Sequence, residues 1–322
     1  MASERAPTAR LGRCAGLRTD GAVMSNSNYE RITAAIAAAL AGDLPAWRKP
    51  WRTIRESGAA TIPRNAITGK SYRGINVPLL WCRQDQDMRF LTYRQAAEHG
   101  GHVKRGEHGT QVVFWQKRQL KSRDDNGEET ERSALLLKLY TVFNISQTEG
   151  VQLPKPRDVV EPRDPPVIML DVFAKLGATV RHGGDQACYA PGPDVICLPR
   201  PEAFSSSDAY AATGLHEATH WSGARPRLDR DLTGRFGTRA YAAEELIAEL
   251  GSAYLSAELG VNMALEHHAA YIDTWRQLLR DDPRAVFTAA SKAQAAADYI
   301  LIKLRPAAVS AEAADNTESE DA

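Results

Sequence analysis

Apolar positions in the second half of the chain recur with helical spacing. The pattern predicts helices over 167–177, 207–222, 239–258, 263–279 and 282–304, with a β-like patch at 194–198. Near the start of the chain, residues 27–42 form another amphipathic segment, which is rich in Ala, Ile and Leu and ends at Gly42. The second half is therefore expected to be mainly helical.

Strand patterns are concentrated in the first half. Apolar and β-branched residues dominate 110–116 and 135–145, whereas 121–133 is polar, which predicts two strands joined by an exposed hairpin loop. A short helix is predicted over 92–100, capped by a threonine and stopped by a glycine. The predicted fold class is α+β, with an N-terminal α+β domain over 27–152 and a mainly helical domain over 167–305.

The segments outside these two domains are expected to have no core of their own. Residues 153–166 are rich in proline and charge, which predicts a semi-rigid linker. Residues 1–26 have no apolar stretch typical of a secretory signal and are expected to be a disordered leader. Residues 306–322 contain five acidic residues and no basic one, which predicts a disordered acidic tail.

The charge distribution indicates a polyanionic partner, although the net charge is zero. Residues 46–123 contain 16 Lys or Arg and 5 Asp or Glu, and a basic block of this size most often binds nucleic acid. The four cysteines show no CxxC spacing, which favours a reducing compartment. No apolar run is long enough to span a membrane, so a cytoplasmic location without a membrane partner is expected.

The clearest chemical signal is an HExxH sequence at 216–220, within a predicted helix. Residues four apart lie on one face of a helix, so the imidazoles of His216 and His220 can bind one cation. Glu217 lies beside them and can act as the general base, accepting a proton from water that the metal activates. A surface helix that carries these residues by chance is the alternative interpretation.

A zinc centre of this type needs a third protein ligand and one open position. The predicted helix 239–258 is apolar on nearly all sides, and a carboxylate buried there is costly unless it meets a cation. We assign Glu245 as the third ligand and Glu249 as an acceptor that orients a ligand imidazole. These two roles could be exchanged, and Glu244 is a further alternative. Zinc is the favoured ion, although other divalent transition metals fit the same donors. The candidates for an oxyanion donor are three tyrosines, Tyr210, Tyr241 and Tyr254.

Basic and aromatic residues are interleaved in the first half. This combination is typical of surfaces that hold single-stranded nucleic acid, because cations follow the phosphates and aromatic rings stack on the bases. Some of these aromatic residues could equally belong to a core. The residues assigned to DNA contact are Trp47, Lys49, Trp51, Arg52, Arg64, Asn65, Lys70, Tyr72, Arg73 and Lys104.

Several long motifs of the chain match a known family. The stretches WRKPW at 47–51, PRNAITGKSYRGIN at 63–76, LTYRQA at 91–96, VKRGEHGT at 103–110 and VFNISQTEG at 142–150 resemble the N-terminal domain of ArdC-type plasmid antirestriction proteins. That domain is also similar to the N-terminal part of a conjugative primase. In the second half, LHEATHWSG at 215–223 and YAAEELIAEL at 241–250, together with 189–191 and 194–199, resemble the zincin-like metallopeptidase domain of the same family.

The resemblance covers residues 28–305 and implies an antirestriction protein. Such a protein binds single-stranded DNA and protects incoming plasmid DNA from host restriction during conjugation, and a protein substrate or a restriction enzyme is a further candidate partner. Two other hypotheses remain open. One is a DNA-associated regulatory metalloprotease whose N-terminal domain only recruits the substrate. The other is a non-catalytic binding protein in which the metal braces the fold.

Overall fold

The computed structural model describes residues 26–41, 62–83, 85, 87–123, 129–154, 164–235, 237–262 and 269–305. The predicted leader up to residue 25, most of the predicted linker and the predicted acidic tail lie outside these residues. The described chain combines helices and strands, so the predicted α+β class is confirmed.

The N-terminal half is built on a sheet with strand order β1-β2-β5-β4. β1 (Arg64–Asn65) pairs in parallel with β2 (Arg89–Thr92), and the other pairs are antiparallel. A second small sheet joins β3 (His102–Val103) to β6 (Thr148–Glu149), which follows the short 3-10 helix η2 (Ile145–Gln147). In the described residues of this half the sheet is joined by the helices α1 (Asn26–Ala41), α3 (Asn76–Trp81) and α4 (Tyr93–Glu98).

The short helix expected over 92–100 is present as α4. The hydroxyl of Thr92 accepts a hydrogen bond from the backbone N–H of Gln95, and the Gln95 side chain accepts one from the N–H of Thr92, which forms a capping box. Gly100 follows with φ +79°, a left-handed conformation that glycine adopts without strain. The cap and the stop therefore both act as the sequence predicted.

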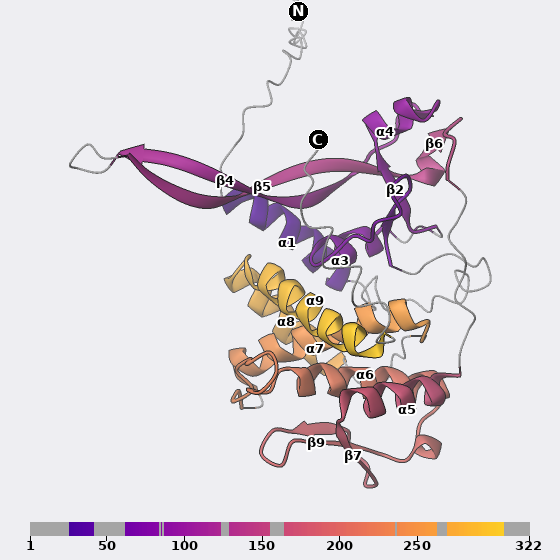
Figure 1. The fold of residues 1–322 in the computed structure, drawn as a ribbon, viewed down its shortest axis with the longest axis vertical. Coiled ribbons are helices and arrows are strands. Elements are labelled where there is room, and N and C mark those ends of the chain that lie inside the picture. Colours follow the sequence, from indigo (N-terminus) through magenta and orange to yellow (C-terminus); the bar gives the residue numbers. More distant parts are fainter. Residues whose placement is uncertain are drawn as a thin grey trace, which may run out of the picture.

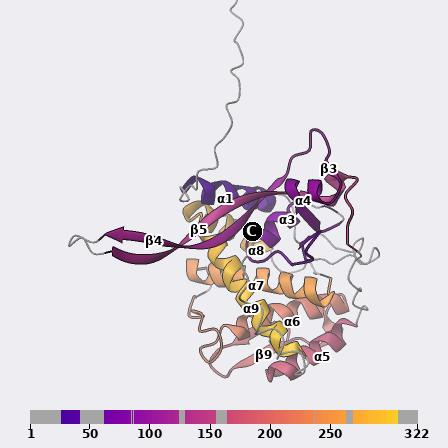
Figure 2. The same cartoon turned by 45° about the horizontal axis from the view of Figure 1, so that its top comes forward.

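The hairpin is longer than its sequence indicated. β4 (Thr110–Arg123) and β5 (Glu129–Asn144) pair without interruption from Thr110↔Val142 to Arg123↔Glu129. The predicted loop over 121–133 is therefore wrong for residues 121–123 and 129–133, which continue the strands. Polarity exaggerated the loop because strand preference depends on pairing and exposure as much as on residue type. The hairpin extends well beyond the helices beneath it (Figures 1 and 2).

The C-terminal half contains five helices in its described residues. They are α5 (Pro165–Leu176), α6 (Ser207–Ser222), α7 (Arg239–Leu259), α8 (Ala269–Asp281) and α9 (Ala285–Leu304). A three-stranded sheet with order β7-β9-β8 lies at the far end of the molecule, beyond α5 and α6 (Figure 1). It consists of β7 (Thr179–His182), β8 (Cys188–Ala190) and β9 (Val195–Leu198), followed by the 3-10 helix η3 (Pro201–Ala203).

The boundaries of α5, α6 and α7 agree closely with the sequence pattern. The predicted helix 263–279 corresponds to α8, which ends two residues later than expected, and residues 263–268 lie outside the described residues. α6 matches the predicted range, with Ser206 as the N-cap and Gly223 at the C-terminal end, and α7 ends one residue later than expected. The predicted helix 282–304 begins only at Ala285, after a turn that contains Pro283. The sequence pattern missed β7 and β8, because each has only three or four residues and little apolar periodicity.

The two halves share one hydrophobic core. The core cluster includes Ile36 of α1 and Trp81 of α3 together with Tyr254 of α7 and Trp275 of α8. The Trp81 and Tyr254 rings are 5.9 Å apart, and the Tyr254 hydroxyl donates a hydrogen bond of 3.1 Å to the carbonyl of Gly74. The helical half therefore packs directly against the N-terminal half.

Helices α6 and α7 approach each other closely because a glycine lies at their contact. A Cβ atom on Gly251 would be 2.6 Å from Cγ2 of Thr219, a distance that packed atoms do not tolerate. This close approach places the HExxH face of α6 opposite the glutamates of α7. The packing of these two helices thus positions the candidate site.

Candidate metal centre

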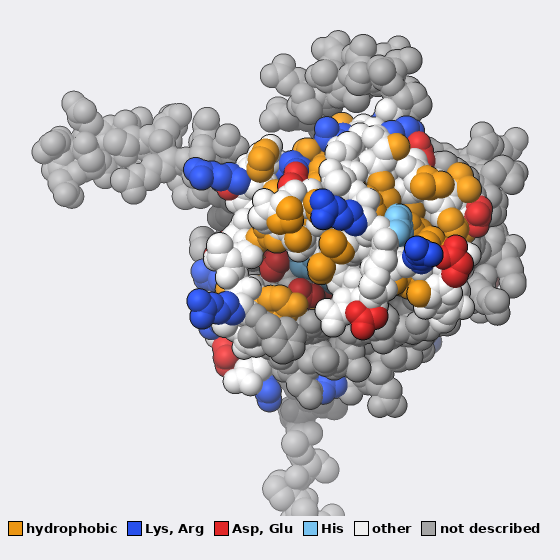
Figure 3. Space-filling model, turned by 90° about the horizontal axis from the view of Figure 1, so that it is seen from below, with side chains coloured by type: hydrophobic (Ala, Val, Ile, Leu, Met, Phe, Trp, Pro, Cys, Tyr) orange, Lys and Arg blue, Asp and Glu red, His pale blue; other side chains and the backbone are white. Residues whose placement is uncertain are grey.

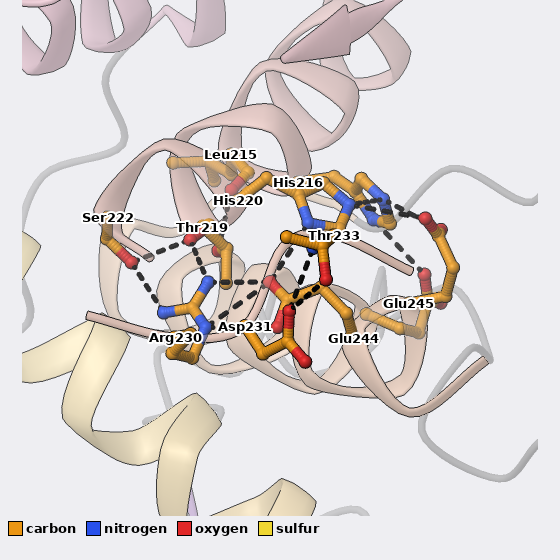
Figure 4. A network of polar contacts seen from close by, with 11 residues as sticks. Leu215, His216, Thr219, His220, Ser222, Arg230, Asp231, Thr233, Glu244 and Glu245 are labelled. Atoms are coloured by element: carbon orange, nitrogen blue, oxygen red, sulfur yellow. Dashed lines mark hydrogen bonds and ion pairs between the residues drawn. The ribbon is translucent and has the colours of Figure 1, made fainter. Parts of the chain in front are cut away.

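Two histidines and one glutamate converge between α6 and α7. The Nε2 atoms of His216 and His220 are 3.2 Å apart. Each lies 3.5 Å from a carboxylate oxygen of Glu245, which faces them from α7. Donor atoms of the three residues all lie within 4.8 Å of one another, and Figure 4 shows the three side chains directed toward the same point.

The donor set suits a divalent transition metal. Imidazole nitrogen and carboxylate oxygen are the ligands found at catalytic zinc sites with two histidines and one glutamate. Two imidazole nitrogens that face each other at 3.2 Å, with a carboxylate on the same side, would share a cation without rearrangement. The residues present therefore fit a metal of this class.

A second layer of charged groups holds the histidines in place. Nδ1 of His220 is 3.1 Å from Oε1 of Glu244, and Nδ1 of His216 is 3.7 Å from Oε2 of Glu249. Glu244 in turn accepts hydrogen bonds from Nε and Nη2 of Arg230. Nη2 also donates to the Thr219 carbonyl, and Nη1 donates to the Ser222 hydroxyl (Figure 4). Each histidine thus has a carboxylate behind it.

Sequence reasoning missed Arg230. Its side chain is only 4% exposed, and it joins the loop after α6 to both α6 and α7. Nothing in the local sequence distinguishes it from the neighbouring arginines at 225 and 227, because its partners lie 11 and 14 residues away. Only the folded chain reveals its position.

The electrostatics of the site favour positive charge. Burial disfavours the charged form of His216, but hydrogen bonds to the carboxylates of Glu245 and Glu249 outweigh burial and raise its pKa to about 10. The same balance raises the pKa of His220. Burial alone would raise the pKa of Glu245, yet hydrogen bonds from the two histidines lower it. The carboxylates around the two histidines thus create a negative potential, which a divalent cation would neutralise.

His216, His220 and Glu245 line a cleft with a volume of about 530 Å³. Glu217, Thr213 and Tyr241 line it, together with Cys188 and Tyr189 from β8. Figure 3 shows the molecule from the side of the three-stranded sheet β7-β9-β8. On this face, acidic side chains lie recessed in a hollow bordered by hydrophobic ones. Glu217 is buried at the cleft wall and directly follows His216 in sequence.

The predicted oxyanion donors are separated by the fold. Tyr241 lines the cleft. The hydroxyl of Tyr210 is 2.9 Å from Nε2 of His182, and Tyr254 is buried at the contact between the two halves. Of the three candidate tyrosines, Tyr241 is therefore the one whose side chain lines the cleft.

A buried arginine fixes the loop that borders the cleft. The guanidinium of Arg227 lies 3.8 Å over the Trp221 ring and donates hydrogen bonds to Asp194 and to the Tyr189 hydroxyl, both at 3.0 Å. Arg227 thereby connects the loop after α6 to the three-stranded sheet.

Several of the described residues predicted to bind DNA also have partners within the protein. Arg73 forms an ion pair with Asp298 of α9, and Arg64 lies 3.5 Å from Glu258 of α7. Oδ1 of Asn65 accepts hydrogen bonds from the N–H groups of residues 67 and 68. Tyr72 packs edge-on against Phe90, and burial raises its pKa to about 12.

Three of the predicted DNA-contact residues, Lys70, Arg73 and Lys104, have exposed side chains on the described surface. Lys70 is exposed, and Lys104 is exposed while its ammonium donates to the carbonyl of Ser146 at 2.8 Å. The remaining residues of this set, Trp47, Lys49, Trp51 and Arg52, lie outside the described residues. None of the helices in the described part of the chain combines the length and apolar character needed to span a bilayer.

Comparison with known families divides the chain at the same place as its motifs. Residues 26–143 match the N-terminal domain of anti-restriction factor ArdC, and residues 169–292 match a zincin-like metallopeptidase domain. A protein of Sinorhizobium fredii, y4eC, is 40% identical over 282 residues, which cover 84% of this chain and 91% of the relative. Two DNA primases TraC of Escherichia coli are each 38% identical, but the match covers only 19% of one and 27% of the other.

Comparison with solved structures also points to ArdC. The crystal structure of the antirestriction ArdC protein from the R388 plasmid in its metal-free form is 40% identical, with a TM-score of 0.69. The Mn(II)-bound structure of that protein is 38% identical, with a TM-score of 0.67. Both matches cover 86% of this chain and 97% of the other. With both domains matched in order and relatives covered nearly end to end, the chain belongs to the ArdC family of antirestriction proteins.

Proposed function

We propose that this protein binds single-stranded DNA through its N-terminal half during plasmid conjugation and carries a metallopeptidase-type site in its C-terminal half. The observation that carries the proposal is the convergence of His216, His220 and Glu245 in a cleft that also contains Glu217. The Mn(II)-bound form of the R388 protein supports a divalent metal at such a site. We expect zinc as the resident ion.

In this proposal His216, His220 and Glu245 are the metal ligands. Glu244 accepts the outer N–H group of His220, and Glu249 lies 3.7 Å from Nδ1 of His216, which orients the rings and leaves Nε2 available for the metal. When bound, the metal supplies Lewis acidity that activates water and polarises a carbonyl. The carboxylate of Glu217 accepts the proton of the attacking water and returns it to the leaving amine.

The cleft geometry favours hydrolysis over a purely structural metal. Structural zinc sites are closed by four protein ligands, whereas catalytic sites use three and keep one position open. In the described residues three donors converge, and they face a cleft large enough for a peptide side chain. Tyr241 lines the same cleft and is the proposed hydrogen-bond donor to the developing oxyanion.

The first test measures metal content. We expect the purified protein to hold about one divalent ion per chain by elemental analysis. His216→Ala should hold almost none, while its circular dichroism spectrum stays unchanged. Equal metal content in both proteins would reject the assigned ligands.

The second test separates the antirestriction role from proteolysis. Glu217→Gln keeps the metal ligands and removes the base, so hydrolysis of a peptide substrate should fall by at least about 100-fold. Protection of incoming plasmid DNA is then measured in a conjugation assay into a restricting host. Loss of protection favours the DNA-associated metalloprotease as the working function, whereas full protection assigns the role to DNA binding alone.

The third test addresses DNA. A labelled single strand is titrated at several salt concentrations, and affinity should fall steeply as salt rises because phosphate contacts release counterions. Binding that is absent, or indifferent to salt, would contradict this half of the proposal.

A further inference from the structure

The exposed large aromatic side chains of the described surface belong to residues other than those that the sequence assigned to DNA. Tyr93, Phe114, Trp115 and Tyr140 are 62%, 57%, 46% and 44% exposed. All four belong to the N-terminal half, and the last three lie on the β4–β5 hairpin. Large exposed aromatic groups that are gathered on one element usually mark a binding surface.

Phe114 and Tyr140 form one face of the hairpin. The register pairs Phe114 with Lys138 and Val112 with Tyr140, so side-chain alternation places Phe114, Lys138 and Tyr140 on the same side. The Phe114 and Tyr140 rings are in contact, with centroids 5.9 Å apart and planes at 84°. Lys138 is exposed beside them. We call these three residues the hairpin face.

The hairpin also carries positive charge. β4 has the sequence TQVVFWQKRQLKSR, which contains four basic residues and no acidic one. β5 contains two basic and two acidic residues, so the hairpin has an excess of four positive charges. It projects beyond the helices in both views, which leaves room for an extended polymer along its length (Figures 1 and 2).

These features favour a single-stranded nucleic acid as the ligand of the hairpin. Sequence-tolerant binding of single strands combines a cationic track for the phosphates with aromatic rings on which bases stack. In a duplex the base faces are already stacked on one another, so the exposed rings would have no partner. An anionic polymer with free apolar rings matches both the charge and the aromatic groups of the hairpin.

We propose that the hairpin face formed by Phe114, Lys138 and Tyr140 is a stacking site for the bases of single-stranded DNA. This inference rests on the proposed DNA-binding function and gives it a location that differs from the predicted contact residues. Arg64 and Arg73 also form ion pairs with Glu258 and Asp298 of the other half.

The test is an anisotropy titration of a labelled 20-nucleotide oligo(dT) at four salt concentrations with the full chain. The double variant Phe114→Ala, Tyr140→Ala should bind about 10- to 100-fold more weakly, since each stacked base contributes substantially to affinity. Phe114→Tyr and Tyr140→Phe keep the rings and should bind as the parent does. Lys138→Ala should reduce the slope of affinity against salt by about one phosphate contact.

Two matched controls lie close at hand. Trp115→Ala removes an aromatic ring from the next position of the same strand, on the opposite face, and should change affinity by less than about threefold. Lys292→Ala removes an exposed lysine of α9 in the other half and should leave the salt slope unchanged. Circular dichroism spectra of all variants report whether the fold is kept.

A second readout identifies the contact directly. An oligonucleotide that contains 5-iodouracil is cross-linked by light, and the modified peptides are found by mass spectrometry. Cross-links at Phe114 or Tyr140 support the inference. If the parent binds the single strand and the hairpin variants bind equally well, or if cross-links form only elsewhere, the inference is overturned while the DNA-binding function stands. If the parent does not bind, both are overturned.

Discussion

At the scale of single residues, the site depends on the different positions of three glutamates on one helix. Glu245 faces both Nε2 atoms, whereas Glu244 and Glu249 lie behind His220 and His216 respectively. The sequence left the roles of these glutamates exchangeable, because each is buried on an apolar helix. Their distances to the imidazole nitrogens now favour Glu245 as the ligand.

Metal affinity should rank the three glutamates. Glu244→Gln and Glu249→Gln each remove an acceptor for an imidazole N–H and should weaken metal binding by about 10- to 100-fold. Glu245→Gln removes a ligand and should weaken it more than either. Competition with a chromophoric chelator measures all three. A larger loss for Glu249→Gln than for Glu245→Gln would exchange the two roles.

Metal affinity should also increase with pH. The pKa of His216 in the metal-free protein is about 10, above its ordinary value of 6.5, so the imidazole holds a proton at neutral pH. This proton stabilises the metal-free fold fully below about pH 6.5, and the stabilisation is lost as the pH rises through about 10. The metal needs the neutral imidazole, so its affinity should rise by roughly tenfold per pH unit between these limits.

Calorimetric titration at pH 6.5, 7.5 and 8.5 tests this dependence. Repeating each titration in buffers with different ionisation enthalpies counts the protons released, and we expect at least about one per ion bound. An affinity that is constant over this range would contradict the proton displacement.

At the scale of elements, the contact between α6 and α7 decides whether the ligands meet. Gly251 allows this contact, since the added Cβ of an alanine would lie 2.6 Å from Cγ2 of Thr219. Thr219 is itself fixed by a hydrogen bond from its hydroxyl to the carbonyl of Leu215. The two helices therefore have little freedom to adjust.

Gly251→Ala should lower both stability and metal affinity. Helix propensity alone would favour alanine by about 1 kcal/mol, but the clash should reverse the sign and destabilise the protein by about 1–3 kcal/mol. Chemical denaturation and chelator competition measure the two effects. Adding Thr219→Ser removes the nearest atom and should recover part of both losses.

Gly192→Ala is the matched control. A Cβ at this position meets no atom within 4 Å, so the substitution should leave stability and metal binding unchanged. If Gly251→Ala behaves like Gly192→Ala, the close packing of α6 on α7 does not position the ligands.

At the scale of the whole molecule, the two halves are joined by a continuous core. Polar contacts reinforce this junction: Gln294 of α9 accepts a hydrogen bond from the N–H of Gly74 at 2.9 Å, and Thr33 of α1 donates to the carbonyl of Pro283 at 2.5 Å. α7 carries the candidate ligands at its beginning and Tyr254 near its end. The same helix therefore connects the metal site to the N-terminal half.

We expect the two halves to unfold together. Tyr254→Ala removes a fully buried ring at the junction and should destabilise the protein by about 3–5 kcal/mol, whereas Tyr254→Phe loses one hydrogen bond and should cost about 1 kcal/mol. Scanning calorimetry should show one transition that moves to lower temperature in both variants. Two separate transitions, of which only one moves, would show that the halves fold independently.

Metal should shift that same transition upward, because an ion that binds only the folded state stabilises it by mass action. Hydrogen exchange extends the test to the N-terminal sheet, which contains no candidate ligand. Slower exchange in β2 and β5 on adding metal would be the sign that the halves are coupled.

The sequence by itself determined the local features of this protein. The HExxH spacing required only the period of a helix, and the boundaries of α4 and α6 agree with caps and stops at Thr92, Ser206, Gly100 and Gly223. These signals act over a few residues, so they can be read along the chain. Family motifs added the two-part organisation.

Tertiary structure decided everything that depends on residues far apart in the chain. Arg230 acts through a glutamate 14 residues away, and Arg64 and Arg73 are turned toward acidic partners of α7 and α9. Among the described residues, three of the four exposed large aromatic side chains belong to the hairpin, whereas Trp81 is buried and Tyr72 is partly buried. Burial and ion pairing depend on which surfaces pack against each other in the folded protein. The spacing of residues along the chain does not specify that packing directly.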